Sequence, residues 1–160
     1  MHQILNCKLM QLVILAGGFG TRLKSILNGL PKPLADVNGE PFLKLLFQNW
    51  VKNGFNDFVL CLHYEADKII KFVNQEQNFG VLKNCKIQFS IEPTPMGTGG
   101  AISYAVKNLD IENYILITNA DTWLDQDYKK IINSDENTIT IVQVENTERY
   151  GSVIIDDKNK

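Results

Sequence analysis

Glycines and basic residues follow the first strongly apolar segment of this 160-residue sequence. The run at residues 12–16 is typical of a buried strand, and it leads directly into Gly17-Gly18-Phe19-Gly20-Thr21-Arg22. Glycines let backbone N–H groups approach an anion closely, while Arg22 and Lys32, which lies between two prolines, add positive charge. This order of residues predicts a strand that leads into a binding loop for a triphosphate.

Three alternative types of loop also contain closely spaced glycines. A P-loop needs G-x-x-x-x-G-K-[ST], and no Gly-Lys pair followed by a hydroxyl residue occurs near Gly17, which excludes that motif. A dinucleotide-binding G-x-G-x-x-G could begin at Gly18, but Leu23 takes its last position, and Leu62-His63 ends the second strand without a ribose-binding acid. A purely structural turn stays open, although it leaves Arg22 and Lys32 without a role.

The composition is that of one soluble globular domain, with 44% hydrophobic and 21% charged residues. We expect this domain to span residues 10–160, with residues 1–9 as an N-terminal extension. A net charge of -2 argues against nucleic acid or an anionic membrane as the main partner, and no apolar run reaches the roughly 20 residues that span a bilayer. The three cysteines lack C-x-x-C spacing, which favours a reducing, cytoplasmic compartment. A homo-oligomer stays open.

The apolar periodicity predicts strands and helices in alternation. Strands are expected at residues 12–16, 57–62, 86–92, 114–118 and 138–144, with a further one near Ser152. Helices are expected from Pro41 to residue 53, at 66–75, at 101–109, and from a first turn holding Asp125 and Asp127 to residue 133. Irregular segments are expected at residues 24–38 and 93–100. The alternation implies a Rossmann-like three-layer α/β sandwich with a mainly parallel sheet.

Unusual residues follow three of these strands. They occupy residues 16–22, residues 92–100 and the tripeptide Asn119-Ala120-Asp121. Ligands of such sheets bind beyond the carboxyl ends of the strands, so we expect the three segments to converge on one crevice.

Four motifs resemble those of the sugar-1-phosphate nucleotidyltransferases. Residues 15–23 together with Pro31-Lys32-Pro33-Leu34 are similar to the signature of that family, and the similarity continues through residues 92–97, 119–121 and 149–151. Residues 99–102 and 119–123 look most like the guanylyltransferases of heptose 1-phosphate and mannose 1-phosphate. In the family reaction, a sugar 1-phosphate oxygen attacks the α-phosphorus of a nucleoside triphosphate, and pyrophosphate leaves.

The resemblance implies catalytic roles for Arg22, Lys32 and Asp121. The two cations would contact the triphosphate and the developing pyrophosphate. A carboxylate at the end of a buried strand needs a cation or donors, and Mg²⁺ held by one carboxylate plus substrate phosphates suits Asp121. An aspartate that caps the following turn is the alternative.

The nucleotide is expected along the glycine loop and the turn near Pro95. The expected nucleotide-binding residues are Leu15, Ala16, Gly17, Gly18, Gly20, Thr21, Glu92, Pro95 and Gly97, and those expected on the sugar side are Asn119 and Gly151. Many relatives have Gln where this sequence has Glu92. A carboxylate only accepts, and guanine offers two adjacent donors where uracil and thymine offer one, so Glu92 favours GTP unless it is a surface residue at a strand end. His63 is expected to be structural.

The resemblance weakens at the end of the sequence. Relatives continue through a Glu-Lys-Pro segment whose lysine binds the sugar phosphate, and later supply a second metal-binding aspartate, but residues 152–160 contain neither. We therefore expect transfer of GMP from GTP to a heptose-type or mannose-type sugar 1-phosphate, with a truncated nucleotide-binding fragment or a regulatory module without turnover as the alternative. The sequence identifies neither the sugar nor the oligomeric state.

Overall fold

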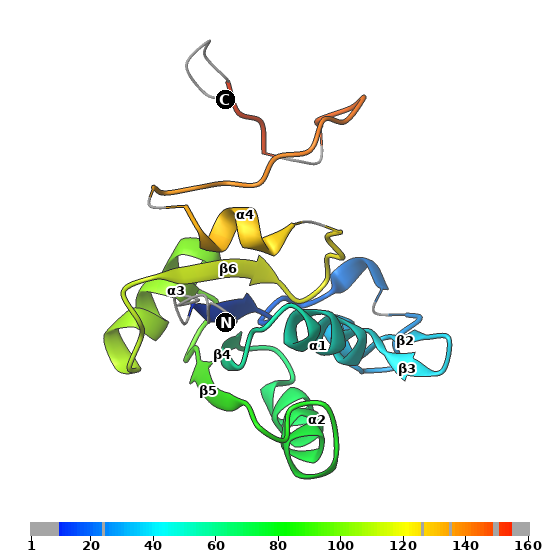
Figure 1. Ribbon diagram of the computed structural model, residues 1–160. Helices are drawn as coiled ribbons and strands as arrows, with labels where there is room; N and C mark the ends of the chain where they lie inside the picture. Colours follow the sequence, from blue (N-terminus) through cyan, green and yellow to red (C-terminus); the bar gives the residue numbers. More distant parts are fainter. Residues whose placement is uncertain (1–9, 24, 126, 135, 149–150, 155–160) are drawn as a thin grey trace.

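The computed structural model describes residues 10–154 except 24, 126, 135 and 149–150, and it describes the backbone alone of Arg22. Among these residues, four strands form a parallel sheet in the order β5-β4-β1-β6 (Figure 1). Its strands are β1 (Gln11–Leu15), β4 (Asp57–Leu62), β5 (Lys86–Ile91) and β6 (Ile115–Asn119). The helices are α1 (Phe42–Lys52), α2 (Ala66–Phe79), α3 (Gly97–Asn108) and α4 (Tyr128–Ile132).

Side chains alternate along each strand, so β1 contributes to two cores. Leu12 and Ile14 belong to the larger core, together with residues of α1, α2 and α4. Val13 belongs to the smaller core, which Ala101 and Ala105 of α3 cover on the opposite face of the sheet. Helices therefore cover both faces, and the predicted Rossmann-like three-layer α/β sandwich is confirmed.

The larger core holds the Lys32 segment in place through α1. Phe47 and Trp50 of α1 and Phe58 of β4 are at most 1% exposed, and Phe47 meets the other two rings edge-on at 5.7 Å and 5.5 Å. Burial of each such side chain contributes about 1.5–3 kcal/mol, which fixes α1 against the sheet. The N–H of Phe42, the first residue of α1, donates to the carbonyl of Ala35 at 2.9 Å. The start of α1 is thereby tied to the short 3₁₀ turn η2 (Lys32–Leu34).

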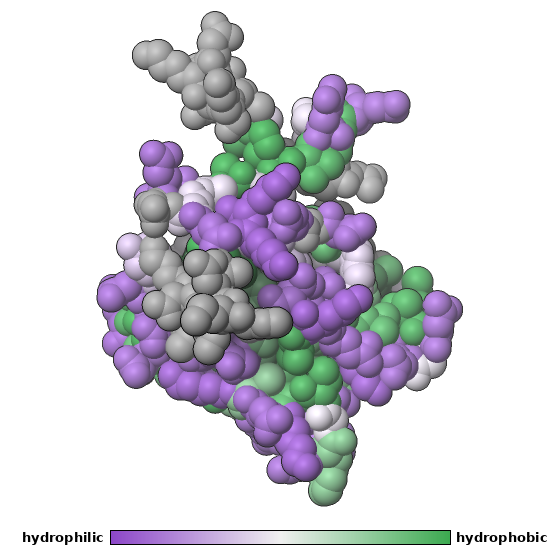
Figure 2. Space-filling view, viewed as in Figure 1, coloured by the Kyte–Doolittle hydropathy of each residue, from purple (hydrophilic) through white to green (hydrophobic). Residues whose placement is uncertain are grey.

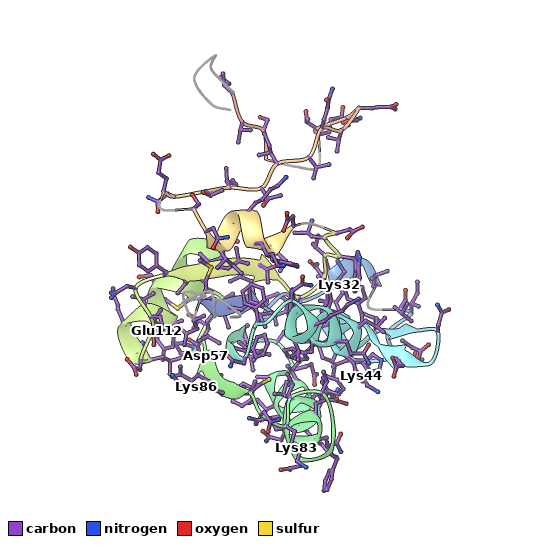
Figure 3. All side chains as sticks on the ribbon, viewed as in Figure 1. Lys32, Lys44, Asp57, Lys83, Lys86 and Glu112 are labelled. Atoms are coloured by element: carbon purple, nitrogen blue, oxygen red, sulfur yellow. The ribbon has the colours of Figure 1, made fainter. Side chains whose placement is uncertain are left out.

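A buried glutamine joins the strands at their amino ends. Gln11 is fully buried, its Nε2 donates to Asp57 Oδ1 at 2.9 Å, and its Oε1 accepts from the backbone N–H of Glu112 at 3.3 Å. Lys86 lies 3.2 Å from the other oxygen of Asp57 (Figure 3). A buried amide is costly unless it is hydrogen-bonded, so these contacts select one register for β1, β4 and β5.

The segment before α1 differs from the predicted irregular stretch. β2 (Asp36–Val37) and β3 (Glu40–Pro41) form a short antiparallel hairpin. Its turn is Asn38-Gly39, whose φ angles of 54° and 90° are the positive values that a two-residue hairpin turn favours. Pro41 consequently ends β3 and caps α1, so its predicted place as the first helical residue is wrong.

Several predicted bounds are wrong by a few residues. α2 continues to Phe79 before Gly80 ends it, and β6 begins and ends one residue later than predicted. α3 begins at Gly97 because the Glu92 carboxylate accepts the N–H of Met96, which precedes the helix. α4 begins at Tyr128, with Asp127 as its N-cap, whose Oδ1 accepts from the N–H of Lys129 at 3.1 Å.

The predicted strand at residues 138–144 is wrong. This segment leaves the body of the molecule, and it carries exposed apolar side chains such as Ile139 and Val142, which are 74% and 69% exposed (Figures 1 and 2). β-branched residues form a strand only when a neighbouring strand pairs with them, and no strand is formed at residues 138–144 in the described part of the chain. Residues 151–154 form no strand either, so the one predicted near Ser152 is not found in that part of the chain. No helix in the described ranges has the length and apolar character needed to cross a bilayer.

Candidate functional site

A crevice of about 720 Å³ lies at the carboxyl ends of the strands. It sits where the strand order reverses, because β1 leads to β4 and β5 on one side while β6 lies on the other. The ladders continue past the strand ends, since Ala120 N–H donates to the Leu15 carbonyl at 3.0 Å and Ala16 N–H to the Cys61 carbonyl at 2.9 Å. The three segments expected to converge therefore meet at one place.

The crevice lining contains most of the predicted site residues. Those that line it are Leu15, Ala16, Gly17, Gly18, Gly20, Thr21, Lys32, Glu92, Pro95, Gly97, Asn119 and Asp121. Gly151 does not line it, because the segment after α4 runs away from the body (Figure 1). The side chain of Arg22 lies outside the described part, as do Arg149 and Tyr150. The lining also contains Phe19 and Thr98, which the sequence pattern did not indicate, and His63, which was expected to be structural.

The phosphate loop, residues 17–21, contains three glycines, and the reason for glycine differs from one position to the next. A Cβ on Gly17 would lie 3.1 Å from the backbone nitrogen of His63 and 3.3 Å from a carboxylate oxygen of Glu92. Gly20 has a φ of +59°, which favours glycine. A Cβ on Gly18 would meet no protein atom within 4 Å. Gly17 and Gly20 are required by the fold, whereas Gly18 leaves open space for a ligand.

These differences predict a contrast between two alanine substitutions. Gly17→Ala should lower the free energy of unfolding by about 1–3 kcal/mol, because the new methyl group presses on backbone and carboxylate atoms. Gly18→Ala should leave it within about 0.5 kcal/mol, yet weaken binding of inorganic tripolyphosphate. Urea denaturation and calorimetric titration measure the two effects. Equal stability of both variants would contradict the packing described for Gly17.

Lys32 and Asp121 form an ion pair across the crevice, from segments 89 residues apart in sequence. The Lys32 ammonium donates to Asp121 Oδ2 at 2.6 Å, and the Thr122 hydroxyl donates to the other oxygen at 3.2 Å. The two charged side chains are 38% and 40% exposed. Such a pair contributes at most about 1 kcal/mol in water, so an incoming anion and cation can separate it at little cost.

Glu92 is buried and faces the phosphate loop from the end of β5. It is 7% exposed, and its Oε2 accepts the N–H of Met96 at 2.9 Å. Met96 precedes α3, so the carboxylate lies at the positive end of that helix, which offsets its loss of hydration. Glu92 is therefore no surface residue, and Oε1, the oxygen near Gly17, keeps capacity for a donor.

His63 and Cys61 come from the end of β4. His63 Nδ1 lies 3.1 Å from the backbone carbonyl of Glu92, and its ring meets Phe19 edge-on at 5.7 Å. Burial, aided by the Glu92 carboxylate, raises the pKa of the Cys61 thiol to about 11, so Cys61 stays protonated at neutral pH and is not a nucleophile. Cys61 is buried, Cys85 is half-buried, and Cys7 lies outside the described residues.

Asp121 is the candidate metal ligand. No group of three or more His, Cys, Asp or Glu side chains able to hold a metal ion occurs in the described part of the chain. A single accessible carboxylate suits Mg²⁺ only when substrate phosphates complete its coordination. Both oxygens of Asp121 contact the side chains of Lys32 and Thr122, so the structure gives no support to a role for that carboxylate as a turn cap.

Comparison with known proteins gives consistent results. A family model described as nucleotidyl transferase matches residues 11–160. The D-glycero-alpha-D-manno-heptose 1-phosphate guanylyltransferase of Campylobacter jejuni is 38% identical over 151 residues, covering 94% of this chain and 65% of the relative. A mannose-1-phosphate guanyltransferase of Aspergillus oryzae is 32% identical over 152 residues, covering 91% of this chain and 41% of the relative.

A solved structure matches as well. HddC from Yersinia pseudotuberculosis, complexed with GMP-PN, superimposes with a TM-score of 0.75 and 41% sequence identity, covering 92% of this chain and 65% of that one. The chain thus spans less than two thirds of the length of these relatives.

Proposed function

This chain belongs to the nucleotidyl transferase family, and from that premise we propose that it transfers GMP from GTP to a sugar 1-phosphate of the heptose or mannose type. The observation that carries the proposal is the meeting of the phosphate loop, the Lys32–Asp121 pair and the buried Glu92 in one crevice. The choice of substrates is supported by the relatives, which are guanylyltransferases of heptose 1-phosphate and mannose 1-phosphate.

The proposed reaction is an in-line displacement at phosphorus. A sugar phosphate oxygen forms a bond to the α-phosphorus of GTP, the bond to the bridging oxygen breaks, and its electron pair leaves with pyrophosphate. Both reactants are anions, so the site must orient them and neutralise charge on the leaving group. Lys32 is placed to supply that charge, and we assign Arg22 the same role from its position in sequence. The N–H groups of the phosphate loop would hold the triphosphate.

Mg²⁺ is the proposed cofactor. Asp121 would hold it together with phosphate oxygens of the substrate, since an accessible carboxylate at a phosphate crevice provides the hard oxygen ligand that this ion prefers. When bound, the ion would neutralise phosphate charge. Lys32 would then leave the Asp121 carboxylate and pair with the triphosphate. Before the substrates bind, the ion pair neutralises the charges of both side chains.

The proposed base selectivity depends on the Glu92 carboxylate. Its Oε1 can accept from N1–H or N2–H₂ of guanine, while Oε2 remains bound to Met96. Uracil offers one N–H between two carbonyl oxygens, and the negative carboxylate repels those oxygens. The base would lie between the phosphate loop and the turn at residues 92–97, where Gly97 leaves room for close approach.

Glu92→Gln is expected to lower the ratio of GTP to UTP affinity by about 10- to 100-fold, because the amide N–H₂ that takes the place of Oε1 is a donor and cannot accept from guanine. The glutamine oxygen can still accept the Met96 N–H, so the turn should keep its shape. Calorimetric titration with each nucleotide measures the ratio. An unchanged preference for GTP would refute the assignment of Glu92 to the base.

The whole proposal is tested by pyrophosphate release from the 160-residue chain. Release should require GTP with Mg²⁺ and a heptose or mannose 1-phosphate, and UTP with glucose 1-phosphate should give little. If the chain binds GTP but releases no pyrophosphate with any sugar phosphate, the proposed turnover by this polypeptide is wrong. The free thiols of Cys61 and Cys85 support the further proposal of a cytoplasmic setting.

A further inference from the structure

His63 contacts both halves of the nucleotide crevice. It follows the last residue of β4, between the phosphate loop and the base turn, defined here as residues 92–97. Its Nδ1 lies 3.1 Å from the Glu92 carbonyl, and its ring lies against Phe19 of the phosphate loop. A side chain at this point can set the position of one half relative to the other.

The contact with Glu92 fixes the base turn. A backbone carbonyl only accepts, so Nδ1 must carry the proton and donate. Glu92 N–H donates to the Leu62 carbonyl at 2.8 Å, and its side chain accepts from Met96. With His63 on its carbonyl, Glu92 is held at three points, which leaves Oε1 aimed in one direction.

The contact with Phe19 fixes the phosphate loop. The Phe19 ring packs edge-on against His63 with centroids 5.7 Å apart and lies 5.4 Å from the ring of Tyr64. Phe19 is 47% exposed, and its buried side contacts these two rings. Tyr64 N–H adds a bond to the Gly17 carbonyl at 3.4 Å. The loop is thus joined to the end of β4 by one side chain and one backbone hydrogen bond.

We propose that His63 is a positioning residue that aligns the base turn with the phosphate loop, so that base and triphosphate of one nucleotide are held together. The inference rests on the proposed function. Its two contacts use different parts of the side chain: the Nδ1–H group sets the base end and the ring sets the phosphate end. The two can therefore be removed separately.

Two substitutions separate the contacts. His63→Phe keeps the ring against Phe19 and removes the donor to Glu92, whereas His63→Asn keeps an N–H near the position of Nδ1 and removes the ring. The affinities of GTP, UTP and inorganic tripolyphosphate are measured for each variant by calorimetric titration. Thermal unfolding followed by circular dichroism checks that each variant is folded.

The expected signatures are opposite. His63→Phe should lower the GTP to UTP affinity ratio by about two- to tenfold and leave tripolyphosphate binding unchanged. His63→Asn should keep that ratio and weaken tripolyphosphate binding by about two- to tenfold. Phe19→Leu should reproduce the result of His63→Asn, because it removes the same ring contact from the other side.

Other outcomes overturn the proposal. If the affinities of all three ligands fall equally in both variants, His63 has only a general structural role. If binding is unchanged in both variants, His63 is not part of the site. If the folded wild-type chain binds tripolyphosphate but does not prefer GTP, the base assignment of the proposed function fails as well. If it binds neither GTP nor tripolyphosphate, the proposed function itself fails.

Discussion

Lys32→Ala should reduce kcat at least about a hundredfold while the affinity for GTP falls only a few-fold. The Lys32 ammonium reaches the crevice from the η2 turn, where it is paired with Asp121 at 2.6 Å. Charge on the phosphate chain grows as the α-phosphorus bond breaks, so a fixed cation there stabilises the transition state more than bound GTP. Single-turnover kinetics and calorimetric titration separate the two quantities.

Lys44 provides the matched control for this substitution. It lies on α1 (Figure 3) and forms an ion pair of similar length, 2.7 Å to Glu40, but it does not line the crevice. Lys44→Ala should change kcat and GTP affinity less than about twofold, because this pair lies outside the crevice. Equal losses of turnover and binding in Lys32→Ala would assign Lys32 to ground-state binding instead.

Asp121→Asn should reduce turnover by about a hundredfold or more, yet raise the affinity for tripolyphosphate in the absence of metal. The amide removes the charge that a divalent cation needs. It also frees Lys32 from its partner and removes a negative charge from the crevice, so a metal-free anion should bind about two- to fivefold more tightly. Turnover assays with Mg²⁺ and titrations in a chelator measure the two effects.

Asp125→Asn controls for the general loss of a negative charge. Asp125 is a carboxylate four residues later on the same connection, and it does not line the crevice. Its substitution should leave turnover and metal-free tripolyphosphate affinity nearly unchanged. Weaker metal-free binding in Asp121→Asn would show that the carboxylate organises the site rather than repelling the anion.

The convergence of the site residues could be predicted because it follows from the order of strands and helices along the chain. Parallel strands present their carboxyl ends at one edge, so the residues after β1, β5 and β6 had to meet there. The glycines, Lys32 and Asp121 are chemically unusual in such positions, and this made them visible in the sequence. His63 is equally close to the crevice, but a single histidine carries no pattern, and its partners Phe19 and Glu92 lie far from it in sequence.

The wrong predictions have tertiary causes. Gly99 and Gly100 lower helix propensity, but the Glu92 carboxylate at the start of α3 and the packing of Ala101 outweigh them. The β-branched residues at 138–144 have high strand propensity, but no strand neighbour holds them in a sheet in the described structure. In contrast, Asn38-Gly39 is a dipeptide typical of the β2–β3 hairpin turn, but the neighbouring prolines and glycines favour an irregular segment.

The most direct test of the nucleotide crevice is a titration of the ¹⁵N-labelled chain with a non-hydrolysable GTP analogue and Mg²⁺, followed by amide NMR shifts. The largest shifts should occur at residues 17–21 of the phosphate loop and at Met96, Gly97 and Thr98 beside the base, with smaller ones at Asp121. The corresponding non-hydrolysable analogue of UTP should give smaller shifts near Met96. Shifts confined to α2 or to the β2–β3 hairpin, with the phosphate loop unmoved, would contradict a nucleotide site in this crevice.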